Sequence, residues 1–185
     1  MNKYCRAAVC VPLGVIKIAF TKLFHMKTFH ASPICMLSPF SEISLDYGGE
    51  LKIERGFKMR DGAKVRVRKS GKCEIGKKVS LNSGNVIACY EKITIGNDVQ
   101  FGPNVLIYDH DHDFRTDGGL SAMKYVTAPV EIGNNVWIGA NCVILRGSKI
   151  GDNCVVAAGT VVKGEYKANQ IIYNQRETLT KEIQK

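Results

Sequence analysis

Residues 130–162 read VEIGNNVWIGANCVILRGSKIGDNCVVAAGTVV, and an aliphatic residue recurs in this stretch at every sixth position. These positions are Ile132, Ile138, Ile144, Ile150, Val156 and Val162. Four places after each of the first five stands a second side chain that suits a buried position, namely Val136, Cys142, Ser148, Cys154 and Thr160. A period of six fits neither an α-helix nor a hairpin, so it predicts short strands separated by corners, with two inward-facing positions per repeat.

Turn-forming residues follow the aliphatic positions. Gly133, Gly139 and Gly151 come directly after three of them, and asparagine or aspartate commonly comes next. Both glycine and asparagine tolerate the positive φ that sharp corners require. Three such hexads make one triangular coil, and stacked coils bury a continuous aliphatic column. The repeat therefore predicts an all-β, parallel solenoid.

The same rhythm extends upstream and sets the expected domain boundaries. It appears at Ile75, Leu81, Ile87, Ile95, Phe101 and Ile107. The eight-residue step from Ile87 to Ile95 predicts a two-residue bulge at one corner, and the lapse after Ile107 predicts an inserted loop over about 108–129. We expect an N-terminal arm or cap at 1–49, the solenoid at 50–164, and a C-terminal strand and helix tail at 165–185, with the helix at 178–185.

Composition narrows the class of protein and of partner. The chain has 185 residues, of which 45% are hydrophobic and 23% charged, which is typical of a single packed domain. The net charge of +9 suits an anionic partner. However, no zinc-finger, helix-turn-helix or aromatic RNA-binding motif accompanies it, so we expect no nucleic acid. Seven cysteines without CxxC spacing argue against disulfides and a zinc site, and favour the reducing cytoplasm.

The N-terminal stretch Val9–Phe24 is apolar, with Lys17 and Lys22 as its only charges. No small-residue cleavage site clearly follows it, and it is short and interrupted for a transmembrane helix. We interpret it as an amphipathic arm. Two roles stay open, namely a segment that caps the solenoid and a peripheral contact with the inner face of the membrane. In the second role, Lys3, Arg6, Lys17 and Lys22 would face anionic headgroups.

The quoted hexads, together with Ile150-Gly151-Asp152-Asn153 and the run from Ala157 to Val162, resemble the hexapeptide-repeat acetyltransferases over roughly residues 50–176. The chain is similar in particular to maltose, galactoside and capsular polysaccharide O-acetyltransferases. The resemblance implies a left-handed parallel β-helix and direct transfer of acetyl from acetyl-CoA to a saccharide hydroxyl, such as that of a surface polysaccharide precursor, without a metal. It also implies a homotrimer with active sites between subunits.

The resemblance places the general base on the inserted loop, which begins Tyr108-Asp109-His110-Asp111-His112. The family's histidine follows its Gly-Pro-Asn-Val hexad at an offset that falls on His112, while His110 comes two residues early. An imidazole with an ordinary pKa near 6.5 can accept a hydroxyl proton at neutral pH. We predict His112 as the base, with His110 as the alternative. A carboxylate should orient the ring, but the sequence does not identify it.

Further site residues carry over from the family by position. Asn82 and Trp137 match residues that contact the acceptor, although Asn82 equally fits a corner and Trp137 a subunit interface. Coenzyme A is expected along coil edges near Gly139, Ala140 and Ala158, whose other role would be corner geometry. The remaining two residues, Lys163 and Arg176, are expected near its phosphates. The tail Tyr173-Asn174-Gln175-Arg176 departs from the family's usual Gly-x-Pro ending.

Three competing interpretations remain at this point. The run His110-Asp111-His112-Asp113 contains metal-ligating residue types, but the downstream histidines of the related carbonic anhydrases are missing. A non-catalytic scaffold would leave the histidine loop without a role. Finally, the acceptor could be an antibiotic or serine, because related β-helices acetylate these as well as sugars.

Overall fold

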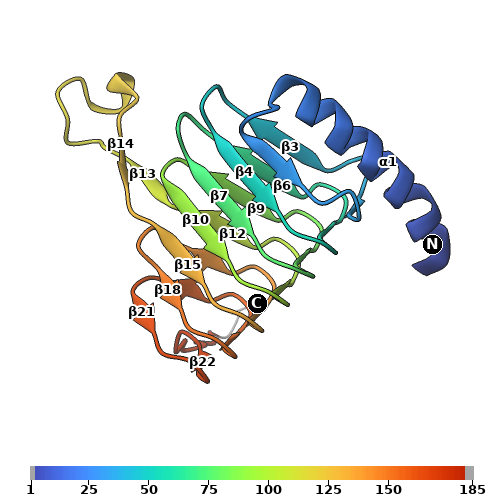
Figure 1. Cartoon of the computed structure of the whole chain (residues 1–185). Helices are drawn as coiled ribbons and strands as arrows, with labels where there is room; N and C mark the ends of the chain where they lie inside the picture. Colours follow the sequence, from blue (N-terminus) through green and yellow to red (C-terminus); the bar gives the residue numbers. More distant parts are fainter. Residues whose placement is uncertain (1–2, 182–185) are drawn as a thin grey trace, which may run out of the picture.

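Three parallel sheets wrap around one aliphatic column in the computed structural model, which describes residues 3–181 (Figure 1). Sheet A contains β1 (Phe29–Ala31), β4 (Glu50–Ile53), β7 (Lys72–Ile75), β10 (Lys92–Ile95), β15 (Val130–Ile132), β18 (Lys149–Ile150) and β21 (Glu165–Tyr166). Sheet B contains β2 (Met36–Leu37), β5 (Lys58–Met59), β8 (Ser80–Leu81), β11 (Gln100–Phe101), β16 (Trp137–Ile138), β19 (Val155–Val156) and β22 (Ile171–Ile172). Sheet C contains β3 (Glu42–Leu45), β6 (Lys64–Val67), β9 (Val86–Cys89), β12 (Leu106–Tyr108), β17 (Val143–Ile144) and β20 (Val161–Val162). Each coil visits A, B and C in turn, which confirms the predicted parallel β-solenoid.

The inward-facing positions of the hexads form the core. All eleven residues that the repeat predicts to be buried between 132 and 162 are at most 3% exposed. The polar members are satisfied within the coil, since the Ser148 hydroxyl donates to the carbonyl of Leu145 at 2.6 Å. The cysteines at 142 and 154 are buried free thiols, as packing residues would be. The hexad therefore specifies the core directly.

Asparagine and glycine have different roles at the corners. Asn135, Asn141 and Asn153 adopt φ values of 53°, 57° and 57°, as predicted for tight corners. The glycines that follow the aliphatic positions do not need positive φ. A Cβ on Gly151 would lie 2.5 Å from the backbone nitrogen of Ala168 in the next coil, so this glycine is required by close stacking.

The solenoid begins earlier than predicted. Phe29 on β1 pairs with Leu51 on β4, so the first coil starts at residue 29 and the boundary near residue 50 was too late.

The two-residue bulge predicted between Ile87 and Ile95 is absent. The step from Ile87 to Ile95 is instead taken up by the four-residue strands β9 and β10, which keep a continuous parallel register with their neighbours.

The N-terminal arm is the helix α1 (Lys3–Phe24), which lies across the open end of the first coil (Figure 1). It approaches β2 closely at Gly14, where a Cβ would lie 3.1 Å from the carbonyl oxygen of Cys35. Ile18 joins the hydrophobic core of the solenoid. The helix therefore caps the aliphatic column, as one of the two predicted roles requires.

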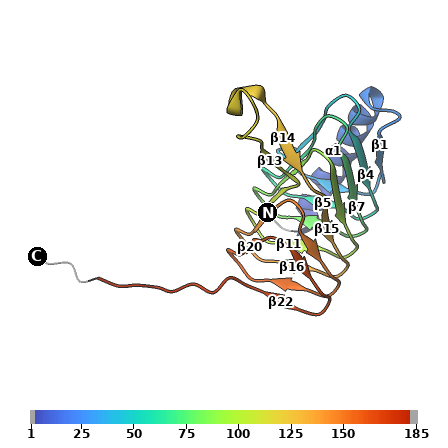
Figure 2. The same cartoon turned by 90° about the vertical axis from the view of Figure 1, so that its left-hand side faces the viewer.

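The predicted C-terminal helix is wrong for residues 178–181. Residues 173–181 form no helix or strand and extend away from the last coil (Figure 2). Residues 182–185, the rest of the predicted helix, lie outside the described part. Eight residues are too few to form a stable helix without packing against the coil.

Candidate active site

A hairpin interrupts the solenoid between β12 and β15. It consists of β13 (His110–His112), the short 3-10 helix η1 (Gly119–Ala122) and β14 (Tyr125–Thr127). The two strands are antiparallel, with His110 opposite Thr127 and His112 opposite Tyr125. The hairpin projects from the corner that joins sheet C to sheet A, here called the C–A corner (Figures 1 and 2). The loop predicted over about 108–129 is thus an ordered arm that carries both histidines.

The root of this hairpin holds a buried carboxylate. Asp109 is fully buried, and its oxygens accept hydrogen bonds from the backbone amides of Tyr90 and Glu91, each at 2.8 Å. A third bond, at 3.1 Å, joins it to Nδ1 of His110. Burial alone raises the pKa of Asp109, but the bonds from His110, Glu91 and Tyr90 outweigh it and lower this pKa below its ordinary value. The carboxylate therefore stays ionised and fixes the start of the hairpin.

The carboxylate that the sequence could not identify thus contacts His110 and not His112. An ionised carboxylate only accepts hydrogen bonds, so Nδ1 of His110 is the donor. Only 13% of the His110 side chain is exposed, because its ring lies 4.0 Å from that of Tyr90 and 5.5 Å from that of Tyr125. His110 is a built-in part of the hairpin base.

His112 occupies the accessible side of the same hairpin. It is exposed, and its ring lies 4.7 Å from that of Tyr125. Among the described residues, no carboxylate forms an ion pair with it. A hydrogen bond joins the side chains of Tyr90 and Tyr125. Burial, and then this bond, raise the pKa of Tyr90 to about 12. The ring of Tyr125 packs against both histidines, and the ring of Tyr90 packs against His110.

A second contact anchors the hairpin from the following coil. Nε of Arg146 donates to a carboxylate oxygen of Asp111 at 2.6 Å, and Arg146 lies at the next C–A corner. The backbone adds a bond from the amide of Ala128 to the carbonyl of Asp109 at 2.9 Å. Arg146, Tyr90 and Tyr125 were not among the predicted site residues. Their only signal is their place at successive C–A corners.

Most of the other predicted site residues lie on a different edge, the B–C corner that joins sheet B to sheet C. Asn82 follows β8, Gly139 and Ala140 follow β16, and Ala158 follows β19. Asn82 is half-buried, and its side-chain oxygen accepts a hydrogen bond from the amide of Ser83 at 2.9 Å, as in a corner. Gly139 is buried, and a Cβ there would lie 2.6 Å from the nitrogen of Ala158. Ala158 is exposed and free to meet a ligand.

The remaining predicted residues are divided between the edges. Trp137 is 58% exposed on the outer face of sheet B. Arg176 donates to the carbonyl of Gly159 and so lies at the B–C corner, next to Ala158. Lys163 is exposed at the C–A corner, after β20. One chain therefore does not bring Lys163 and Arg176 to the same edge, and sheet C separates His112 from Ala158.

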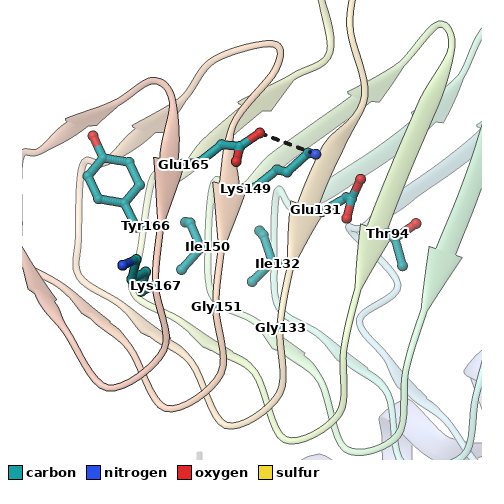
Figure 3. Close-up of a pocket in the computed structure, with 10 residues that line it drawn as sticks. All are labelled: Thr94, Glu131, Ile132, Gly133, Lys149, Ile150, Gly151, Glu165, Tyr166 and Lys167. Carbon is teal, nitrogen blue, oxygen red and sulfur yellow. Dashed lines mark ion pairs between the residues drawn. The ribbon is translucent and has the colours of Figure 1, made fainter.

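A shallow groove of about 430 Å³ lies elsewhere, on sheet A. Figure 3 shows its lining side chains, among them the ion pair between Lys149 and Glu165 at 3.3 Å. It contains none of the predicted site residues, and its side chains are those of an open ladder of charges. Among residues 3–181, no group of three or more His, Cys, Asp or Glu side chains is arranged to hold a metal ion.

The six-residue repeat of this chain also occurs in known proteins. Residues 129–164 match the family described as bacterial transferase hexapeptide (six repeats). Those residues carry the hexapeptide repeat of that family. The galactoside O-acetyltransferase of Escherichia coli (strain K12) is 35% identical over 101 residues, which are 52% of this chain and 47% of that protein. The putative lipopolysaccharide biosynthesis O-acetyl transferase WbbJ of the same strain is 35% identical over 102 residues, 51% of this chain and 52% of WbbJ. The resemblance to hexapeptide-repeat acetyltransferases is confirmed.

The sequence matches cover only part of this chain and of its relatives. The chain spans about half the length of the curated relatives it matches. A solved structure of AntD, an N-acyltransferase from Bacillus cereus in complex with dTDP and 3-hydroxybutyryl-CoA, is similar with a TM-score of 0.64. The identity is 17%, and the match covers 82% of this chain and 81% of AntD. At that identity the likeness concerns the fold.

Proposed function

We propose that this protein transfers the acetyl group of acetyl-CoA to a hydroxyl of a saccharide, with His112 as the general base. The observation that carries the proposal is the position of His112, exposed on an ordered hairpin whose base is fixed by Asp109 and Arg146. The relatives support the chemistry, since they include a galactoside O-acetyltransferase. All seven cysteines are free thiols, which supports the cytoplasm as the location.

The proposed step needs one proton acceptor. A ring nitrogen of His112 takes the proton of the acceptor hydroxyl while its oxygen attacks the thioester carbonyl. The tetrahedral adduct then collapses, the carbon–sulfur bond breaks, and the sulfur leaves with the proton from the imidazolium. A backbone amide at the site would stabilise the oxyanion. His110 is less suited to this task, because the rings of Tyr90 and Tyr125 enclose it and only 13% of its side chain is exposed.

We also propose that the active site forms between subunits of a homotrimer. If three solenoids stand parallel around a threefold axis with sheet C facing inward, the C–A corner of each meets the B–C corner of the next. His112 of one subunit then faces Asn82, Ala140 and Ala158 of its neighbour. No single chain can make this arrangement, because these residues lie on different corners.

The outer faces of the sheets support this choice of interface. From β9 to β20, sheet C presents an apolar row of neighbouring strand residues, whereas β3 and β6 at its other end carry the ion pair of Glu42 with Arg66 at 2.7 Å. The row consists of Val86, Leu106, Val143 and Val161. Sheet A instead presents charges, including the ion pair of Glu50 with Lys72 at 3.1 Å. Apolar area is favoured at subunit interfaces and charged ladders at solvent. Arg176 and Ala158 would bind coenzyme A at the B–C corner, with Lys163 on the opposite edge.

The test is thiol release from acetyl-CoA with a panel of mono- and oligosaccharides. We expect acceptor-dependent release to fall by roughly a hundredfold or more in His112→Ala. The matched control is His30→Ala, an exposed histidine outside the hairpin, which should keep full activity. If His110→Ala loses activity and His112→Ala does not, the base is His110 paired with Asp109. Acetylation of amines or of serine, without any saccharide product, would overturn the proposed acceptor.

A further inference from the structure

Helix α1 has two apolar faces, of which the solenoid uses one. The inner face carries Cys10, Gly14 and Ile18, which are buried on the first coil. Between the faces, Nζ of Lys17 donates to the carbonyl oxygens of Ser41 at 2.6 Å and Ser38 at 3.1 Å. Lys17 therefore ties the helix to the solenoid and is not free to meet an external partner. This corrects the expectation that Lys17 belongs to a basic outer face.

The outer face of α1 is apolar along its length. Its large side chains are between 39% and 68% exposed: Val9, Leu13, Ile16, Phe20, Leu23 and Phe24. Met26, just beyond the helix, is 69% exposed. A helix on a protein surface normally presents polar side chains to water, so an uninterrupted apolar stripe on its exposed face indicates a covering partner.

The charge of this region identifies the chemistry of the partner. Residues 9–41 contain three lysines, namely Lys17, Lys22 and Lys27, and no aspartate or glutamate. Lys22 and Lys27 stand beside the C-terminal end of the apolar stripe and are exposed. Apolar side chains flanked only by positive charge are complementary to a bilayer with anionic headgroups.

We propose that the outer face of α1 docks on an anionic lipid surface, with the helix lying parallel to the membrane plane. By length and composition Ala7–Phe24 would also pass as a membrane span, which is weak evidence by itself. The contacts of Gly14, Lys17 and Ile18 with the first coil favour surface docking, because spanning would break all of them. The side chains of Lys3 and Arg6 lie outside the described part and carry none of this argument.

The test is flotation of the full chain with vesicles of phosphatidylcholine alone or mixed with phosphatidylglycerol. We expect at least tenfold more bound protein on the anionic vesicles, and release by salt of the part due to Lys22 and Lys27. The double variant Ile16→Glu with Phe20→Glu should lose roughly tenfold or more of the binding. Leu179→Glu, which changes a still more exposed leucine in the tail, is the matched control and should bind normally.

Other outcomes would overturn the proposal. Equal binding to both vesicle types, or none to either, would exclude an anionic lipid surface. Resistance to alkaline carbonate extraction would show a spanning helix. A doubled particle mass in solution that the double variant abolishes would show that a second copy covers the stripe. Flotation needs neither substrate nor turnover, so its failure is distinct from failure of the proposed acetyl transfer.

Discussion

Asp109 and His110 are neighbours in the chain, and their side chains are joined by a hydrogen bond of 3.1 Å at the base of the hairpin. This contact makes His110 part of the structure that holds the hairpin, while His112, two residues further, remains exposed on it. His110 is thus enclosed at the hairpin base, whereas His112, the proposed general base, is accessible.

Replacing Asp109 by asparagine should destabilise the fold at neutral pH by about 2–4 kcal/mol, because charge-assisted hydrogen bonds to a buried group are lost. Since the folded-state pKa of Asp109 is lowered, its contribution is present above the unfolded pKa of about 3.9 and is lost as pH falls through the folded value. Urea unfolding at pH 7 and at pH 3 measures this. A stability gap between wild type and variant that does not shrink at acid pH would contradict the role of the ionised carboxylate.

Removing the Arg146 guanidinium should loosen the hairpin with little effect on global stability. Both partners of the Arg146–Asp111 pair are partly exposed, so Arg146→Ala should cost less than about 1 kcal/mol. We expect faster amide hydrogen exchange over 110–127 and a several-fold lower kcat. Lys149→Ala, which breaks an exposed ion pair on sheet A, serves as the control and should change neither.

A larger side chain should lower stability at Gly139 but weaken coenzyme A binding at Ala158. Gly139→Ala should destabilise the solenoid by about 1–3 kcal/mol, because its Cβ would lie 2.6 Å from a backbone nitrogen. Ala158 is exposed, so Ala158→Leu should leave Tm unchanged. It should raise the KM for acetyl-CoA roughly tenfold, which corresponds to a loss of about 1.4 kcal/mol in binding free energy. Thermal unfolding and initial-rate kinetics on both variants separate packing from binding. An unchanged KM in Ala158→Leu would remove coenzyme A from this corner.

Because each proposed active site contains residues of two subunits, mixing two inactive variants should restore activity. His112→Ala lacks the base and Ala158→Trp blocks the opposite corner, so each trimer alone should be inactive. Random co-assembly restores both halves at about a quarter of the interfaces. We expect that share of wild-type activity, and a particle of three times 20.4 kDa in solution. Val143→Asp, on the outer face of sheet C, should lower the particle mass and the activity together, whereas Glu131→Lys on sheet A should not. Two inactive variants that stay inactive after mixing would indicate sites within single chains.

The sequence by itself determined the solenoid. A six-residue period fixes which side chains face inward within each coil, and this local pattern correctly placed Ile132, Cys142 and Ser148 in the core. The break in the period after Ile107 likewise located the hairpin that carries both histidines. Coils contact mainly their neighbours, so a regular repeat is enough to predict how they stack.

Only the tertiary structure decided what lies between coils and between edges. The partner of Asp109 depends on the stacked corner at Tyr90 and Glu91, which the local sequence around the histidines does not reveal. The division of His112 and Ala158 between two corners follows from the closed triangular path of the chain. The apolar stripe of α1 is exposed because the first coil covers only one side of the helix. Each of these depends on contacts between distant segments, which a repeat period does not encode.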